Sequence, residues 1–190
     1  MAFYDFMQKL ILARQIRFDE GRVEILNQPM VISPAWAFAY LLKVAKDPTE
    51  MGYLIYEGTK QATREGMAIQ VKKEKKLVGI DLARWIMQSG SLAGWGKLSL
   101  REFDEKTSSA KVMSENSVIS QLFGKSSFPV DHAIRGFSAG TACVVFERDD
   151  IEAIETKCIA LGDKMCQFEF MPREKLDFKN PLIKKQIREK

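Results

Sequence analysis

The sequence has little of what marks membrane, secreted or disulfide-rich proteins. None of its apolar runs reaches the roughly 18 residues of a membrane-spanning helix. The N-terminus lacks the basic start and small-residue cleavage site of a secretory signal, so we expect a cytoplasmic protein. Three cysteines in 190 residues are too few for a disulfide scaffold, but a pair of thiols in a reducing compartment suits a metal.

Excess positive charge is also scarce. The net charge is +4, and much of it lies in the short runs 72–76 and 184–190. Such runs are typical of solvated faces, so the sequence does not predict direct nucleic-acid binding. A Gly-rich dinucleotide fingerprint and an internal repeat are missing, and the composition, 46% hydrophobic and 28% charged, is that of a globular domain.

The order of helical and alternating patterns predicts an α+β fold. Apolar spacing and helix caps indicate helices over residues 2–13, 35–45, 47–71, 78–91, 116–123 and 130–146. Period-two patterns indicate three hairpins, formed by residues 15–18 with 22–26, 97–103 with 110–114, and 151–160 with 165–170. A hairpin alone cannot bury both faces, so we expect helices packed against an antiparallel sheet of hairpins.

The chain shows no internal linker. We therefore expect a single domain over residues 1–170, followed by a basic, loosely packed tail over 171–190. Small residues such as Gly136 and Gly140 suit the helix over 130–146 to close packing against a neighbour, and Cys143 in the same helix fits a small core position.

The last hairpin carries the residues best suited to binding a metal. Cys158 lies near the end of one strand and Cys166 just after the turn, so antiparallel pairing brings the two thiols close. Glu155 joins them only if the strand bulges or twists, because strict alternation points it to the opposite face. Two thiolates and a carboxylate suit zinc, and either Asp131 or His132, the only histidine, could supply a fourth ligand. From spacing alone, two buried, inert thiols are the more frequent case.

These motifs resemble the 4-vinyl reductase domain family over residues 10–170. The most specific part is Glu155 and Cys158 followed by Gly162-Asp163 and Cys166. The resemblance implies the fold of NO-signalling and Golgi-transport ligand-binding domains, shared with TRAPP vesicle-tethering subunits. It also implies a zinc held by Glu155, Cys158, Cys166 and a cysteine near the start of the preceding helix. Asp131-His132 stands at that fourth position here, and of the two we favour His132, because histidine is an equally good zinc ligand.

The resemblance implies small-molecule binding rather than catalysis. Related domains form the sensor modules of aromatic-responsive transcription activators, and a zinc with four protein ligands has no open position for substrate. We therefore expect a homodimer with an apolar pocket for a small hydrophobic or aromatic molecule. The expected lining residues, each of which also suits a plain core position, are Trp95, Val112, Val118, Phe123, Phe128 and Phe137.

Two other functions stay open. One is a protein-interaction or scaffold subunit of the TRAPP type. The other is an enzyme, or an accessory protein, in the reduction of a tetrapyrrole vinyl group. The sequence shows no serine or cysteine nucleophile paired with a histidine base, and fold-level analogy does not fix function, so whether the chain is an enzyme is not decided at this level.

Overall fold

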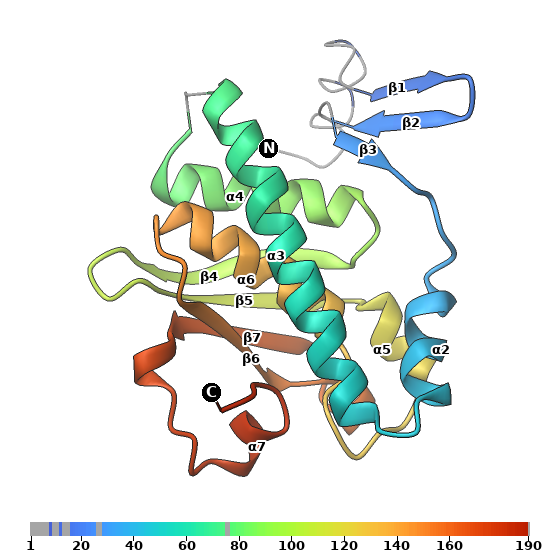
Figure 1. Ribbon diagram of the computed structural model, residues 1–190, viewed down its shortest axis with the longest axis vertical. Helices are drawn as coiled ribbons and strands as arrows, with labels where there is room; N and C mark the ends of the chain where they lie inside the picture. The colour runs from blue at the N-terminus through green and yellow to red at the C-terminus, as the bar shows by residue number, and fades with distance from the viewer. Residues whose placement is uncertain (1–7, 9–11, 13–15, 26–27, 75–76, 190) are drawn as a thin grey trace.

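The computed structural model describes residues 16–25, 28–74 and 77–189, together with Gln8 and Leu12. It confirms the α+β fold, with helices and two antiparallel sheets (Figure 1). The predicted helix over residues 2–13 lies almost wholly outside the described residues. Across the part of the chain that is described, no helix combines the length and apolar character needed to cross a lipid bilayer.

The first hairpin is part of a small three-stranded sheet. Its strands are β1 (Ile16–Asp19), β2 (Arg22–Ile25) and β3 (Gln28–Met30), paired in that order. The first two strands follow the predicted hairpin, and the third was not predicted. This sheet stands apart from the four-stranded sheet that forms the centre of the molecule (Figure 1).

The other two predicted hairpins form the central sheet. Its strands are β4 (Lys97–Asp104), β5 (Ser109–Glu115), β6 (Ile151–Lys157) and β7 (Cys166–Pro172). The spatial order is β4-β5-β7-β6, so the two hairpins join through the antiparallel pairing of β5 with β7. Strand β6 is therefore an outer strand, and a short 3-10 helix, Ile159–Leu161, follows it.

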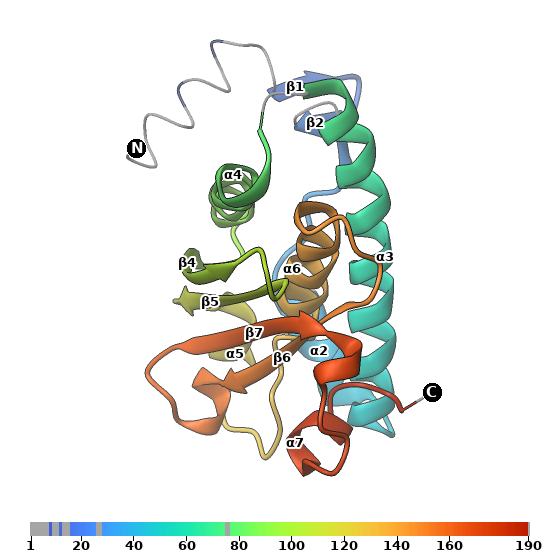
Figure 2. The same cartoon turned by 90° about the vertical axis from the view of Figure 1, so that its left-hand side faces the viewer.

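Five of the predicted helices are present close to the predicted ranges. They are α2 (Trp36–Val44), α3 (Pro48–Glu74), α4 (Gly79–Leu92), α5 (Val118–Phe123) and α6 (His132–Val145). Helix α6 lies against the sheet, and α3 packs on the other side of α6. Helix α4 lies beside β4 (Figure 2). A Cβ on Gly136 would collide with the Tyr56 carbonyl, and one on Gly140 with the Lys60 carbonyl. Helices α3 and α6 therefore pack backbone to backbone, as the small residues predict.

The C-terminal segment differs from the expected loose tail. After β7 the chain forms a 3-10 turn, Arg173–Lys175, and a short helix, α7 (Pro181–Lys184). Ile183 and Ile187 are buried in the hydrophobic core, and Gln186 has no exposed surface. Residues 173–189, called the C-terminal segment below, are thus packed onto the domain.

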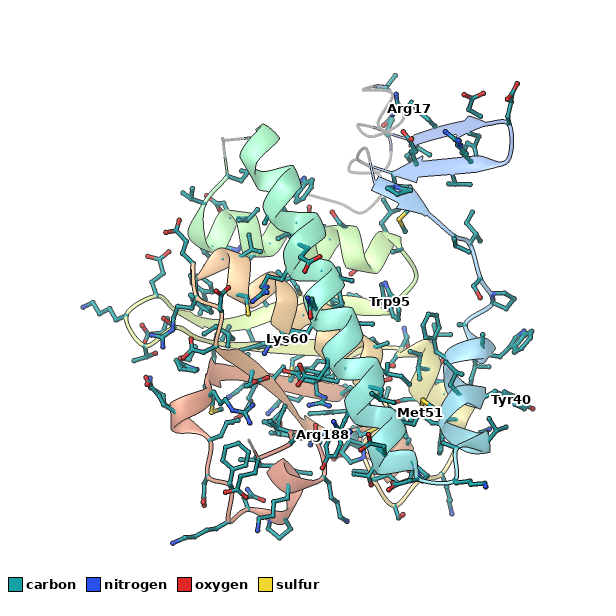
Figure 3. The ribbon with its side chains drawn as sticks, in the orientation of Figure 1. Arg17, Tyr40, Met51, Lys60, Trp95 and Arg188 are labelled. Atoms are coloured by element: carbon teal, nitrogen blue, oxygen red, sulfur yellow. The ribbon has the colours of Figure 1, made fainter. Side chains whose placement is uncertain are left out.

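Helix α2 and the residues before it expose several large apolar side chains. Trp36, Tyr40 and Val44 on this helix, with Val31 and Ile32 before it, are all more than half exposed. Tyr40 projects away from the rest of the molecule (Figure 3). These five exposed side chains are called the α2 patch below. Groups of exposed apolar side chains often mark interaction sites.

Candidate metal centre and ligand pocket

Four acidic side chains meet between the last hairpin and the start of α6. They are Asp131, Glu155, Cys158 and Cys166, and a ligand atom from each lies within 4.8 Å of those from the others. All four residues are completely buried. The structure thus brings together three of the four residues expected as metal ligands.

A strand irregularity places Glu155 beside the two cysteines. The register of β6 against β7 shifts between Glu155 and Lys157, which is the bulge that the alternation argument requires. The turn that follows passes through Gly162, whose φ of 103° lies in the left-handed region that favours glycine. The Asp163 carboxylate accepts a hydrogen bond from the Cys158 amide at 2.9 Å and fixes the chain after the strand.

The fourth member of the group is Asp131, and the structure does not bring His132 there. Successive residues of a helix point about 100° apart, so only one of this pair can face the hairpin. The His132 ring turns instead toward α3, where a Cβ on Gly52 would lie 2.6 Å from its Nε2 atom. Its Nδ1 atom lies 3.2 Å from Nη2 of Arg135. Among the two alternatives left by the sequence, the geometry favours Asp131.

Helix α5 and its N-cap residue, Ser117, supply the hydrogen bonds that orient this carboxylate. The Ser117 hydroxyl donates to Oδ1 of Asp131 at 2.7 Å, and the Ser120 hydroxyl donates to Oδ2 at 2.9 Å. Ser120 Oγ also lies 3.4 Å from Cys158 Sγ and 3.6 Å from Cys166 Sγ. Such outer partners hold metal ligands in the required orientation. The two serines could not be recognised from the sequence, because they lie far from the hairpin along the chain.

The pKa values of these four buried groups show strong mutual interaction, which a bound cation would offset. Burial, together with the nearby Asp131 and Cys158, raises the pKa of Glu155 well above its usual range. Burial also raises the pKa of Asp131 to about 6. Hydrogen bonding from Cys166 lowers the pKa of Cys158 to about 5, and the same contact raises the pKa of Cys166. Four buried acidic groups repel one another when ionised, and a divalent cation would relieve that repulsion.

The donor atoms fit zinc. Cysteine sulfurs and carboxylate oxygens are both zinc ligands, and structural zinc sites use four protein ligands. Among the described residues, Glu155 Oε1 has no hydrogen-bond partner although it is buried, which leaves a lone pair free for a metal. A surface depression of about 390 Å³ is lined in part by Ser120 and Ile159, which are neighbours of the group.

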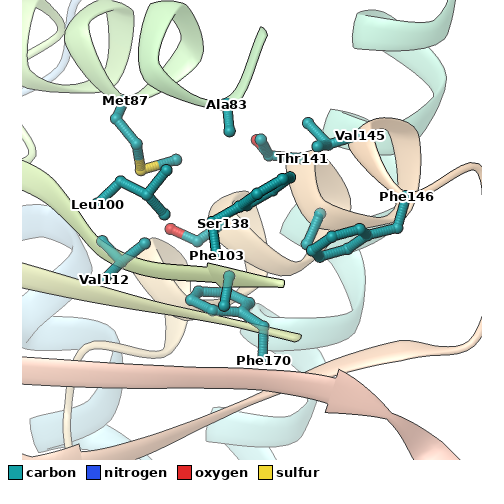
Figure 4. A pocket seen from close by; sticks show the side chains of 12 residues that line it. Ala83, Met87, Leu100, Phe103, Val112, Ser138, Thr141, Val145, Phe146 and Phe170 are labelled. Carbon is teal, nitrogen blue, oxygen red and sulfur yellow. The ribbon is translucent and has the colours of Figure 1, made fainter. Parts of the chain in front are cut away.

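A second feature is an apolar cavity between α4, α6 and the central sheet (Figure 4). Its volume is about 20 Å³. The lining residues are Ala83, Met87, Leu100, Phe103, Ala110, Val112, Ser138, Thr141, Ala142, Val145, Phe146 and Phe170. Phe103 and Phe146 stack with ring centroids 5.0 Å apart and planes inclined by 15°.

The residues expected to line one pocket are distributed over several sites. Val112 lines the cavity of Figure 4. Trp95 and Val118 line a wider surface cleft of about 520 Å³ beside α2. Phe123 and Phe128 pack edge to face with centroids 5.9 Å apart, and Phe137 packs against the core. Phe103, Phe146 and Met87 were not identified as lining residues from the sequence. They come from three different elements, which only the folded chain brings together.

Comparison with solved structures identifies the fold. No protein-family model and no curated protein matches the sequence. The crystal structure of the phenol-responsive sensory domain of the transcription activator PoxR, with phenol, superposes with a TM-score of 0.78 at 16% identity, over 99% of this chain and 98% of that one. This chain has the fold of that sensory domain.

Two further solved structures are similar. Subunit 3 of a trafficking protein particle complex from Naegleria fowleri, covalently bound to palmitic acid, has a TM-score of 0.50 at 14% identity, over 75% of this chain and 95% of that one. A vinyl-4-reductase family protein from Methanocaldococcus jannaschii has a TM-score of 0.49 at 16% identity, over 93% and 97%. The PoxR sensory domain and the trafficking subunit confirm the fold implied by the sequence resemblance.

Proposed function

We propose that this chain is a sensor-type domain that binds a small, neutral, hydrophobic or aromatic molecule and is stabilised by zinc. The fold of a phenol-responsive sensory domain supports the proposal, although fold alone does not fix function. The ligand site is the cavity between α4, α6 and the central sheet. The cytoplasmic location expected from the sequence stays a prediction.

The proposal rests on the buried Ser138 hydroxyl, which lacks a hydrogen-bond partner among the described residues. The Ser138 side chain is 1% exposed and lines the cavity. A helical serine can donate to the carbonyl four residues before it, as Thr141 does to Phe137 at 3.0 Å, but Ser138 does not. Its hydroxyl points instead toward Leu100 and Val112 (Figure 4). An unpaired buried hydroxyl costs about 1–3 kcal/mol, which a ligand with one hydrogen-bonding group would recover.

The rest of the lining sets the chemical class of the ligand. No charged side chain of the described residues lines the cavity, so a charged ligand would be left without a counter-charge. Phe103, Phe146 and Phe170 supply aromatic surface. A cavity of about 20 Å³ holds only about one water molecule, so a ligand must displace side chains. Methionine side chains adapt readily, and Phe103 and Phe146 are partly exposed, so we assign the opening to Met87 and this stacked pair.

Calorimetric titration with phenol and toluene tests the ligand site. The two molecules are similar in size, but only phenol pairs with the Ser138 hydroxyl. We expect wild-type protein to prefer phenol, and Ser138→Ala to bind phenol about tenfold more weakly with toluene binding unchanged. Thr141→Val is the matched control, because the Thr141 hydroxyl is already paired. Absence of binding by both molecules would reject the cavity as a ligand site.

In this proposal Asp131, Glu155, Cys158 and Cys166 hold the zinc. A zinc with four protein ligands has no open position, and what it supplies is a cross-link between chain segments. The cross-link ties the β6–β7 hairpin to the start of α6, the helix that carries Ser138. The metal would therefore stabilise one wall of the ligand cavity.

The α2 patch supports self-association, and we propose that a second copy of the chain covers it. Trp36→Glu places a charge in the patch, so light scattering after size exclusion should show a dimer for wild type and a monomer for this variant. Leu161→Glu changes an exposed apolar residue elsewhere and should leave the dimer intact. A monomeric wild type would instead favour a different protein partner, which is the interaction-subunit function.

A further inference from the structure

The outer strand of the central sheet is covered by side chains rather than by another strand. Strand β6 pairs with β7 on one side, and no described strand pairs with its other side. At Ala153 the amide donates to the Tyr56 hydroxyl at 3.0 Å, and the carbonyl accepts from Nη1 of Arg135 at 2.9 Å. Because buried backbone groups need partners, these side chains replace a missing strand.

Two residues further along β6, the side-chain amide of Gln186 pairs with the backbone of Glu155. The Glu155 amide donates to Oε1 of Gln186 at 2.8 Å, and Nε2 of Gln186 donates to the Glu155 carbonyl at 3.0 Å. This pair of bonds reproduces what a residue of an antiparallel strand would make. Gln186 has no exposed surface, so water does not compete for these bonds.

Other contacts hold the C-terminal segment in the position that this pairing needs. Nη2 of Arg135 donates to the Gln186 carbonyl at 2.9 Å. Nη1 of Arg173 donates to Oε1 of Glu152 on β6 at 2.8 Å. The Tyr53 hydroxyl of α3 donates to the Lys184 carbonyl. The segment is therefore anchored on α3, α6 and β6 together.

Glu155 connects the C-terminal segment to the candidate metal centre. Its backbone is held by Gln186, while its side chain belongs to the candidate metal centre, where Oε2 accepts from the Asp131 amide at 3.1 Å. Movement of the segment away from β6 would release the Glu155 backbone and leave its amide and carbonyl without partners. Loss of the metal would release the Glu155 side chain and so loosen the backbone that Gln186 binds.

We propose that Gln186 is a positioning residue for Glu155, and that metal binding and docking of the C-terminal segment stabilise each other. This inference rests on the proposed zinc centre. Coupling between two sites is reciprocal in equilibrium, so each site must report on the other. Binding or loss of the metal would then change how firmly the C-terminal segment is docked.

The first experiment measures zinc retention against a chromophoric chelator. Gln186→Ala removes both bonds to Glu155, and Gln186→Glu keeps an acceptor but loses the donor. We expect both variants to bind zinc about tenfold or more weakly, which is the usual effect of removing an outer partner of a metal ligand. Lys185→Ala is the matched control, because this exposed neighbour lies on the same segment and should not change retention.

The second experiment uses wild-type protein and so does not depend on how a variant folds. Hydrogen exchange is compared between zinc-loaded protein and protein stripped by chelator. We expect faster exchange of the amides of residues 182–188 after stripping, with the amides of α4 unchanged. A uniform increase that includes α4 would contradict a specific coupling, as would no change in residues 182–188.

The outcomes separate this inference from the proposal beneath it. If wild-type protein holds no zinc, the metal centre fails and the coupling fails with it. If wild-type protein and Gln186→Ala hold zinc with equal affinity, the metal centre stands and the coupling alone is overturned.

Discussion

The Tyr56 hydroxyl on α3 donates a 2.6 Å hydrogen bond to Oε2 of Glu152 on β6, with both side chains buried. The same hydroxyl accepts from the Ala153 amide. Tyr56→Phe therefore leaves a buried amide unpaired and should lower the free energy of unfolding by about 1–3 kcal/mol. Urea denaturation measures this, with Tyr40→Phe in the exposed α2 patch as a control that should be neutral. Equal losses for the two variants would contradict the importance of the pair.

Glu152 should give a pH-dependent contribution to stability. Burial alone raises its pKa, but Lys60, Tyr56 and Arg173 together lower it below the usual 4.5. A carboxyl with a depressed folded pKa stabilises above its unfolded pKa, and that contribution is lost as the pH falls through the folded value. Glu152→Gln should thus be less stable than wild type at neutral pH, and the gap should narrow below pH 4.5. Denaturation at several pH values measures the gap, and a constant gap would refute the assignment.

Close packing of α3 on α6 makes opposite predictions for two glycines. A Cβ on Gly136 would collide with the Tyr56 carbonyl and Thr59, so Gly136→Ala should destabilise by about 1–3 kcal/mol. Gly58 also lies in a helix, but no described atom stands within 4 Å of a Cβ there. Gly58→Ala should therefore stabilise by about 0.5–1 kcal/mol. Thermal unfolding compares the two, and a shift of the same sign in both would mean that the close approach is misplaced.

Local features could be predicted from the sequence, and features that depend on rotation or long-range packing could not. The Cys158–Cys166 pairing follows from one hairpin, and a bulge near Glu155 follows from alternation. The choice between Asp131 and His132 depends on the angle at which α6 begins, which neighbouring residues cannot reveal. The cavity unites Met87, Phe103 and Phe146 from three elements, whereas the aromatic residues chosen from the sequence belong to other packing sites.

The C-terminal segment shows the same division. Its lysines and arginines led to the prediction of a loosely packed tail, although almost as many apolar residues lie among them. Ile183 and Ile187 nevertheless enter the core, since their spacing places both on the inner side of one helical turn. The role of Gln186 depends on an outer strand that forms only after the whole sheet has assembled.

Separate substitutions distinguish the two candidates for the fourth metal ligand. Asp131→Ala removes a carboxylate from the group and should abolish zinc binding, whereas His132→Asn should retain it, because the ring faces Gly52. Zinc content of the two purified variants decides between them. Retention by Asp131→Ala with loss by His132→Asn would restore the histidine favoured by the sequence.

Metal content tests the proposed centre most directly. Elemental mass spectrometry of the purified protein is compared with that of a Cys158→Ala, Cys166→Ala double variant whose fold is checked by circular dichroism. We expect about one zinc ion per chain in the wild type and none in the folded double variant. A wild type without metal, or equal zinc in both proteins, would contradict the zinc centre and leave the two cysteines as ordinary core thiols.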